Sequence, residues 1–172
     1  NFMKNLFIIR HSKAKPYIEG QEDHDRPLNK IGKEDAKITG NWLNNVSINI
    51  DIIFSSSSLR TKATTALITE HLDSKPKVII DNNLYLADEN YLFQYIKQIN
   101  VEFDTIALVG HEPGLKRLLN LLSGSFVSGL ENVLDKKFST SAAAVILLNI
   151  PFWSSINERE GTLFKYFNNR NT

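Results

Sequence analysis

Two arginines and two histidines stand just after short apolar runs in this sequence, and their side chains share one chemistry. Arg10 and His11 directly follow the first run. Arg60 and His111 come shortly after two later runs. Guanidinium and imidazole groups offer hydrogen-bond donors and positive charge, and a neutral imidazole nitrogen can also attack as a nucleophile. The ligand that matches this set of groups is a phosphate.

The first apolar run, residues 6–9, indicates how such a site would be positioned. Its unbroken Leu-Phe-Ile-Ile sequence is typical of a strand buried on both faces, as in a parallel sheet covered by helices on both sides. Arg10 and His11 would then lie at the carboxyl end of a central strand, where open α/β sheets place their ligand sites. Taken alone, the pair has another interpretation, in which Arg10 pairs with a surface carboxylate and His11 is a loop histidine. Because Arg60 and His111 also follow strands, the three strand ends together favour one shared site.

The composition predicts an ordinary globular protein. The chain has 172 residues, of which 42% are hydrophobic and 23% charged, and we expect one domain over residues 3–172. Asn1 and Phe2 precede Met3, and we interpret them as residues added before a native start. The apolar runs are shorter than the roughly 18 residues that a membrane span needs, and no leader segment opens the chain. We therefore expect a soluble, cytoplasmic protein that does not bind membranes.

The lack of cysteine and the balanced charge argue against several functions. Without cysteine there is no thiol nucleophile, disulfide or cysteine-ligated zinc. The net charge is +1, and no run of like charges or mixture of basic and aromatic residues indicates nucleic-acid binding. The carboxylates show no cluster at metal-ligand spacing, so we expect no metal. Any anion that the protein binds should be small and held locally.

The spacing of apolar residues predicts alternating strands and helices, and hence an α/β fold. Strands are predicted over residues 6–9, 50–54, 78–80, 105–109, 140–149 and 163–167. Helices are predicted over residues 30–44, from the serine run 55–58 to residue 72, from 88 to about 100, after 113, and over 129–136. Asn29 and Asp88 are predicted caps. The second helix would hold Arg60 in its first turn, where the helix dipole favours an anion, and its apolar positions are Ala63, Ala66, Leu67 and Leu72.

Several polar residues near the predicted strand ends have two interpretations. Residues 16–30 form a polar, turn-rich segment that is long enough to fold over the crevice at His11. Within it, Arg26 either contacts the substrate or anchors the loop through an ion pair. Thr140 and Ser141 either contact a bound phosphate or only begin a strand.

Six short motifs, in chain order, resemble those of the histidine phosphatase superfamily. They are Arg10-His11, Asp25-Arg26-Pro27-Leu28 with Gly32, Ser55-Ser56 with Arg60 and Thr64, Leu84-Tyr85-Leu86-Ala87, Gly110-His111 with Pro113-Gly114-Leu115, and Ser139-Thr140-Ser141-Ala142. Within that superfamily the chain is most similar to the SixA-type phosphohistidine phosphatases. The motifs span nearly the whole chain, and the early Arg-His found together with the late Gly-His is the specific part of the pattern.

The resemblance implies a phosphoglycerate mutase-like, three-layer α/β/α sandwich with a mostly parallel central sheet. It also implies a phosphohistidine intermediate and no metal or other cofactor. On the family's pattern His11 matches the nucleophile, Arg10 and Arg60 match phosphate-binding arginines, and His111 matches the second histidine of the phosphate pocket. Electrostatics supports these roles, because nearby guanidinium charges lower the pKa of His11 and keep it neutral for attack. Positive charge around the phosphoryl oxygens also stabilises the transition state.

The sequence departs from the family pattern in two places. Ser12 stands where glycine is common, and we expect it to be tolerated. SixA-type proteins resemble the class that lacks the usual carboxylic acid for protonating the leaving group. Here Glu112, directly after His111, is placed like the acid of another branch and is a candidate proton donor. Asp88 and Glu89 are alternative donors, although Asp88 also suits a helix cap.

These observations predict a metal-independent phosphatase that acts through a phosphohistidine on His11. The expected substrate is a phosphorylated protein, carrying phosphohistidine, or a small phosphorylated metabolite. At 172 residues the chain lacks the long insertions that would wall in a sugar phosphate, which argues against a mutase. The alternative from another class is a catalytically idle module that only binds phosphate or a phosphoprotein. Retention of His11 with both Arg10 and Arg60 favours the enzyme.

Overall fold

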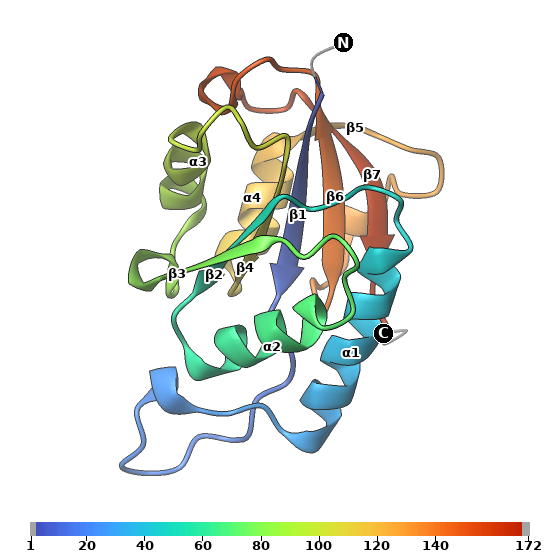
Figure 1. Ribbon diagram of the computed structural model, residues 1–172. Coiled ribbons are helices and arrows are strands. Elements are labelled where there is room, and N and C mark those ends of the chain that lie inside the picture. The colour runs from blue at the N-terminus through green and yellow to red at the C-terminus, as the bar shows by residue number, and fades with distance from the viewer. Residues whose placement is uncertain (1–2, 170–172) are drawn as a thin grey trace.

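The computed structural model describes residues 3–169, and in them the chain folds around a seven-stranded sheet (Figure 1). Asn1 and Phe2, which we interpreted as added residues, lie outside the described part of the chain. The strands are β1 (Lys4–Arg10), β2 (Ile52–Ser56), β3 (Lys77–Asp81), β4 (Thr105–Gly110), β5 (Ser123–Phe126), β6 (Ala143–Leu148) and β7 (Gly161–Phe167).

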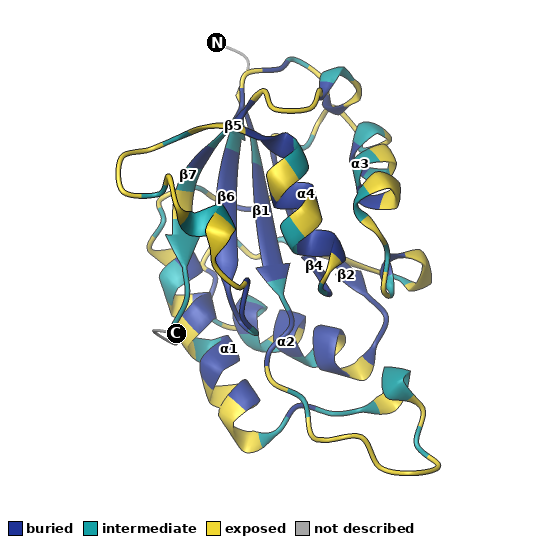
Figure 2. Ribbon diagram, turned by 180° about the vertical axis from the view of Figure 1, so that it is seen from behind, coloured by how far each residue is buried: buried dark blue, intermediate teal, exposed yellow. Residues whose placement is uncertain are grey.

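The strand order is β3-β2-β4-β1-β6-β7-β5, and every neighbouring pair that excludes β6 is parallel. β6 runs antiparallel to both β1 and β7. The sheet is therefore mostly parallel, as predicted. Its central strands are buried on both faces, which Figure 2 shows for β1, β4 and β6. This burial explains the unbroken apolar sequence at the start of the chain.

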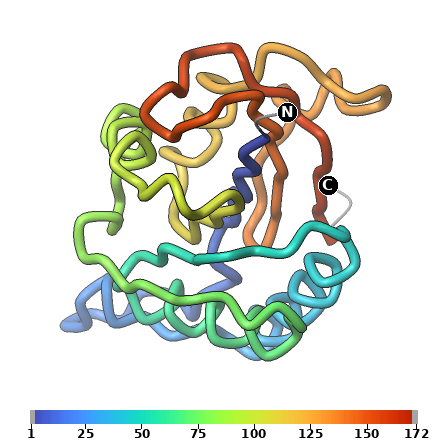
Figure 3. The backbone as a smooth tube through the Cα atoms, turned by 45° about the horizontal axis from the view of Figure 1, so that its top comes forward, coloured from blue at the N-terminus to red at the C-terminus, as the bar shows by residue number. Residues whose placement is uncertain are grey.

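Four α-helices of the described residues cover the two faces of the sheet. They are α1 (Lys30–Asn44), α2 (Leu59–Thr69), α3 (Glu89–Lys97) and α4 (Gly114–Leu122). The odd-numbered side chains Phe7 and Ile9 of β1 pack with residues of α1 and α2, whereas Leu6 and Ile8 pack with residues of α3 and α4. The alternation of side chains along a strand thus produces two cores. Figure 3 shows α1 and α2 together on one side, so the predicted α/β/α sandwich is confirmed.

The first helix, α1, has the predicted bounds. Its first turn packs closely against the backbone of the segment that follows His11. Asn29 caps α1 by accepting a hydrogen bond from the backbone N–H of Gly32. A Cβ on Gly32 would lie 2.1 Å from the backbone oxygen of Lys13, so only glycine permits this approach. At the far end of the helix Trp42 stacks on Phe167.

The second helix differs from its prediction in the face that it buries. Arg60 is in the first turn, as predicted, but the predicted apolar positions do not form the buried side within the helix. Ala66 is exposed, and Ala63 and Leu67 are only half-buried. The buried residues are instead mostly polar, namely Arg60, Thr61, Thr64, Thr65 and Ile68. The start of α2 packs against hydrogen-bonding groups of the candidate site. Its buried face is therefore polar there, whereas the buried face of a surface helix is usually apolar.

Other element bounds also differ from prediction. The strand β5 lies in a stretch for which we predicted no strand, and the helix predicted over 129–136 is only a 3₁₀ turn, Val133–Asp135. The predicted strand over 140–149 begins later, at Ala143, because Thr140 and Ser141 form a turn. The strand over 50–54 extends to Ser56, and α3 ends at Lys97. Element ends are the least reliable part of a prediction from sequence.

Candidate active site

The predicted residues meet at one edge of the sheet. Arg10 ends β1 beside Gly110, which ends the parallel strand β4, and the N–H of His11 donates to the Gly110 oxygen at 3.1 Å. His111 follows immediately. Because β6 is antiparallel, the turn before it reaches the same edge, where the N–H of Ser141 donates to the His11 oxygen at 3.0 Å. Figure 1 shows the loop after β1 at this edge, below α2.

His11 is buried and held in one tautomer. Its Nδ1 lies 2.7 Å from the backbone oxygen of Ser12, and a carbonyl oxygen only accepts. Nδ1 therefore carries the proton in the neutral ring, and the lone pair is on Nε2. The imidazole ring of His111 lies 5.2 Å away, centre to centre. A phosphoryl group could thus be attacked by Nε2 of His11 while it contacts His111.

The surroundings of His11 keep its ring uncharged. Burial, helped by the charges of Arg10 and Arg60 and opposed by the Ser12 carbonyl, lowers its pKa to about 4. Burial disfavours the charged imidazolium because the protein interior solvates it poorly. The nucleophilic form of His11 is therefore available at neutral pH.

His111 is held between Ser56 and Arg60. Its Nε2 lies 2.8 Å from the Ser56 hydroxyl, and its Nδ1 lies 3.4 Å from Nη2 of Arg60. Since a guanidinium only donates, Nδ1 accepts and Nε2 carries the proton. Burial, together with His11 and the charge of Arg60, lowers the pKa of His111 to about 3. Both histidines are thus neutral in this structure, and the positive charge of the site comes from arginine.

Arg60 projects from the first turn of α2 and is clamped by Asp23 in the loop after β1. Nη1 donates to the Asp23 backbone oxygen at 2.8 Å, and Nη2 donates to its carboxylate at 3.0 Å. Ser58 caps the helix by accepting from the N–H of Thr61, which fixes the turn that carries Arg60. The Nε of Arg60 is buried without a hydrogen-bond partner. One donor of the guanidinium is therefore left for a ligand.

Asp23 joins three elements at the entrance to the site. Besides Arg60, it accepts hydrogen bonds from the Tyr85 hydroxyl and, at 3.0 Å, from Nε of Arg26. Partial burial raises the pKa of Asp23, but the hydrogen bonds from Tyr85 and Arg60 and the Arg60 charge outweigh burial and hold that pKa well below its usual range. The carboxylate is ionised at neutral pH. Arg26 forms an ion pair that anchors the loop, as in one of its two interpretations, and its contact with a substrate stays a prediction.

Arg10 and Glu112 lie at the other side of the site. Nη1 of Arg10 donates to the Phe138 oxygen at 3.0 Å, and its Nε is buried without a partner. Glu112 is half-buried and accepts from the N–H of Lys116 at 2.8 Å. Burial raises the pKa of Glu112, although that hydrogen bond and the charge of Arg10 oppose the rise. A raised pKa makes the protonated acid more accessible near neutral pH.

The other candidate donors are placed differently. Asp88 is exposed and caps α3 by accepting from the N–H of Tyr91, as predicted for a cap. Glu89, in the first turn of α3, lines a surface cavity with Arg117 and Arg159. Asp23, whose low pKa keeps it ionised, is a poor proton donor. Glu112 combines a raised pKa with an electrostatic interaction with Arg10.

Ser12, Ser141 and Thr64 form a buried frame around the backbone of His11. The N–H of Ser12 donates to the Thr64 hydroxyl at 2.9 Å, and the Ser12 and Ser141 hydroxyls are hydrogen-bonded to each other. Ser141 has a φ of 66°, and its oxygen accepts from Thr39. Thr140 lies half-buried in the same turn. Ser141 thus holds the segment after β1 in place, and neither residue begins the strand.

The structure adds site residues that the sequence analysis did not assign. Asp23 and Tyr85 hold Arg60 in place, and the Ser56 hydroxyl accepts from Nε2 of His111. Tyr85 follows the end of β3, so the strand-end signal that located the other residues applied to it as well. Ser56 belonged to a noted motif but had no role. Asp23 gave no signal, because its partners lie up to 62 positions away along the chain.

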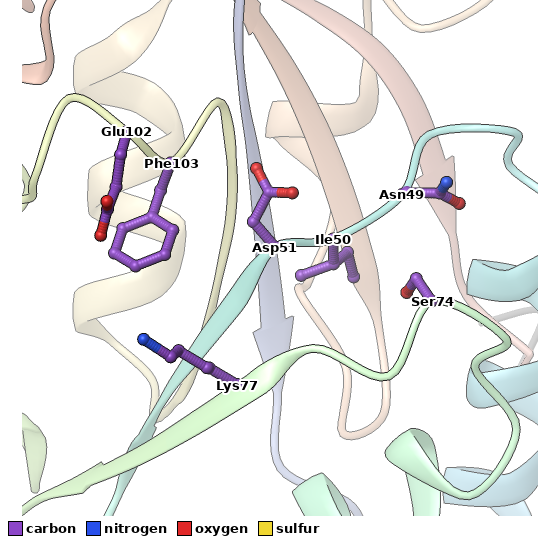
Figure 4. Close-up of a pocket in the computed structure, with 7 residues that line it drawn as sticks. All are labelled: Asn49, Ile50, Asp51, Ser74, Lys77, Glu102 and Phe103. Atoms are coloured by element: carbon purple, nitrogen blue, oxygen red, sulfur yellow. The ribbon is translucent and has the colours of Figure 1, made fainter.

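A larger surface cavity lies at the opposite end of the strands. Its volume is about 560 Å³, and it is lined by the residues in Figure 4, among them Asp51, Lys77 and Phe103. These residues precede or begin strands β2, β3 and β4, whereas the histidines follow strand ends. Asp51 is already used, since its carboxylate accepts the N–H groups of Asp104 and Thr105. This cavity is therefore separate from the candidate site.

In residues 3–169 no helix is long and apolar enough to cross a membrane. Within the same part of the chain, no group of three or more histidine, cysteine or acidic residues is placed to hold a metal ion.

The fold and the paired histidines agree with what sequence comparison finds. Residues 6–85 match the model of the histidine phosphatase superfamily, branch 1. Over 141 residues the chain is 30% identical to an uncharacterised protein of Mycobacterium tuberculosis, Rv1276c, a match that covers 80% of this chain and 85% of that protein. The chain belongs to the histidine phosphatase superfamily. Membership supports a phosphatase activity on phosphorylated substrates.

Solved structures share the whole fold. The SixA protein of Nakamurella multipartitia superposes with a TM-score of 0.81 at 22% identity and covers 96% of each chain. The protein histidine phosphatase SixA complexed with tungstate gives a TM-score of 0.75 at 22% identity, over 95% of this chain and 96% of that one. The fold is thus that of the SixA-type proteins, as the motifs implied.

Proposed function

We propose that this protein is a phosphatase that transfers a phosphoryl group to Nε2 of His11 and then to water. The observation that carries the proposal is the state of His11. Its ring is neutral, its Nδ1 is occupied by the Ser12 carbonyl, and arginine side chains face the site from two strand ends. A module that only binds phosphate has no need of a neutral imidazole with a directed lone pair.

In the first step Nε2 of His11 attacks phosphorus and the bond to the leaving group breaks. Arg10 and Arg60 would neutralise the phosphoryl oxygens, and each has a buried Nε without a partner in the described structure. His111 would contact the same group from the facing side. The tungstate complex of SixA is consistent with an oxyanion at such a site, since tungstate is a tetrahedral anion like phosphate.

Glu112 is the proposed proton donor for a leaving alkoxide. In the second step the same carboxylate would accept a proton from the water that attacks the phosphohistidine, which restores neutral His11 and releases phosphate. A leaving imidazole needs this acid less, because it is far less basic than an alkoxide. Thr140 and Ser141 act, in this proposal, through the backbone of the His11 segment, and Arg26 acts through Asp23.

We propose a phosphohistidine protein as the preferred substrate and a small phosphomonoester as the alternative. The fold it shares with SixA supports the first. The competing function is a module that binds phosphate without turnover. It stays open because the Asp23 carboxylate already holds Arg60 in this structure. We propose no requirement for a metal, because two arginines supply the charge that a cation would bring.

A substrate panel tests the proposal directly. Turnover of a phosphohistidine protein should exceed that of alkyl phosphomonoesters, and the same preparations should be assayed with His11→Ala as the blank. A phosphatase gives phosphate release that disappears in His11→Ala. Saturable phosphoprotein binding without any release of phosphate would instead identify the idle module.

A further inference from the structure

The strand β3 forms one edge of the sheet and exposes a run of apolar residues. The exposed fractions of Val78, Ile79 and Ile80 are 41%, 43% and 45%. Their only sheet neighbour among the described strands is β2. Edge strands are usually protected by charges, proline or bulges, since their free backbone groups pair readily with another strand. Here the charges stand only at the two ends, Lys77 and Asp81.

The backbone groups that face away from β2 can be identified. The N–H of Lys77 donates to the Asp51 oxygen at 3.1 Å, so Lys77 points toward β2. In a parallel pair the direction alternates along the strand, so Ile79 and Asp81 also point toward β2. The N–H and C=O groups of Val78 and Ile80 therefore face the free edge. They offer two donors and two acceptors to an added strand.

The β3 sequence Lys-Val-Ile-Ile-Asp is complementary to itself when two copies run antiparallel. A register centred on Ile79 places Val78 opposite Ile80 of the second copy, and each such pair exchanges two backbone hydrogen bonds through the groups that face outward. The same register places Lys77 opposite Asp81 of the second copy. These two positions form a pair without backbone hydrogen bonds, where side chains approach most closely. Hydrogen bonding, apolar contact and charge thus agree on one register.

Side chains beside the edge extend this surface on one face. Ile79 is in register with Phe54, whose ring contacts Tyr95 of α3. Asp81 accepts from the Tyr95 hydroxyl, and Lys77 extends toward Phe103, as Figure 4 shows. A cavity of about 290 Å³ next to them is lined by Phe54, Tyr95, Gln98, Ile99 and Asn100. Both charges therefore lie on the same face as Ile79, as the pairing requires.

We propose that two copies of this chain associate through antiparallel pairing of their β3 strands about a two-fold axis at Ile79. The sheet would continue across the dimer, and the apolar edge would be covered by its own copy. A C2 interface of this kind needs a self-complementary patch, which Lys77–Asp81 supplies. The proposal concerns an edge of the sheet and does not depend on the proposed phosphatase function.

Sedimentation of the whole chain over a wide concentration range provides the first test. We expect a reversible monomer–dimer equilibrium, weakened roughly tenfold or more by Ile79→Lys, which sets two like charges against each other across the axis. Ile38→Lys is the matched control, because Ile38 is similarly exposed, at 47%, on α1. Circular dichroism checks that both variants fold. A wild-type chain that stays monomeric at all concentrations overturns the proposal.

A single introduced cysteine tests the register, since the chain has no cysteine of its own. In the proposed pairing the two Ile79 Cα atoms lie about 4.5 Å apart, within the range that a disulfide bridges. Ile79→Cys should therefore form a covalent dimer at least about tenfold faster than Val78→Cys, whose side chain faces the opposite side of the sheet. Ile38→Cys gives the rate of random encounter. Equal rates for all three variants, or a faster rate for Val78→Cys, would refute this pairing.

Discussion

In the proposed mechanism His11 is prepared for attack by groups that are close to it along the chain or in space. The Ser12 carbonyl sets the tautomer, and burial with the charges of Arg10 and Arg60 keeps the ring neutral. His111 has the same protonation state for a similar reason. Both rings are neutral, so their charge does not show which one is the nucleophile. Variants of each histidine are needed to separate the two proposed roles.

Replacing each histidine should separate nucleophile from binding group. His11→Ala should abolish turnover and the phosphoenzyme but keep part of the phosphate affinity, because the arginines remain. His111→Ala should lower kcat by about 10²- to 10³-fold, the loss typical when a group that contacts the transferring phosphoryl is removed, and should still label His11. The measurement is protein-bound radiolabel that is acid-labile and base-stable. Label that persists in His11→Ala and vanishes in His111→Ala would reverse the assignment.

The low histidine pKa values predict a loss of stability on acidification. The folded protein binds fewer protons than the unfolded chain between pH 6.5 and the folded pKa values of about 4 and 3, so stability falls as pH drops through that window. At pH 5 each histidine should cost on the order of 2 kcal/mol of unfolding free energy. Urea unfolding at pH 7.5 and pH 5 measures the loss. The double variant His11→Gln with His111→Gln should show a clearly smaller loss, and an equal loss would show that the two histidines are not its source.

Glu112 is expected to matter in proportion to the basicity of the leaving group. Glu112→Gln removes the proton donor, so kcat for an alkyl phosphate should fall by about 10²-fold or more. An aryl phosphate or a phosphohistidine should lose little, because those groups leave without protonation. Comparing kcat for the three substrates in both proteins gives the answer. A uniform loss over all three would show that Glu112 acts in another way.

At the scale of elements, the loop after β1 is tied to α2 through Asp23 and Arg60. The clamp passes from the loop to the first turn of the helix and on to Tyr85 after β3. The three segments belong to different parts of the chain, so the orientation of Arg60 depends on how they pack. In the proposed mechanism Asp23 is therefore a positioning residue for Arg60, which we propose binds the phosphate.

Asp23→Asn should lower kcat roughly tenfold while phosphate binds no more weakly. The amide loses the charge that orients Arg60, but it also removes a negative charge that competes with phosphate for the same guanidinium. Steady-state kinetics with inorganic phosphate as inhibitor separates the two effects. Asp25→Asn, in the same 3₁₀ turn, is the control and should leave both constants near wild type. A rise in KM with unchanged kcat would argue against a positioning role.

At the scale of the whole molecule, the fold gathers Arg10 and Arg60 at one sheet edge, and in the proposed mechanism they supply the positive charge for phosphoryl transfer. We therefore expect turnover to survive prolonged dialysis against a strong chelator, with less than about a twofold change in kcat. The assay should include a readdition series with Mg²⁺ and Zn²⁺. A large loss that either ion restores would show that the protein uses a metal.

Much of the site could be predicted from sequence because its signals are local. An unbroken apolar run indicates a buried strand, a serine or asparagine cap marks the start of a helix, and a ligand site is expected where strands end. These signals located Arg10, His11, Arg60 and His111, which the structure brings to one edge. The bounds of α1 followed from its cap and periodicity in the same way.

Only the tertiary structure decided the remaining features, because they depend on contacts between distant segments. The clamp of Asp23 on Arg60 joins residues 37 positions apart, and the antiparallel direction of β6 is what brings Ser141 to His11. The apolar residues of β3 resemble those of a buried strand, yet the strand order leaves them exposed at an edge. Composition and periodicity describe each segment by itself, whereas hydrogen-bond partners and edge positions arise only when segments pack together.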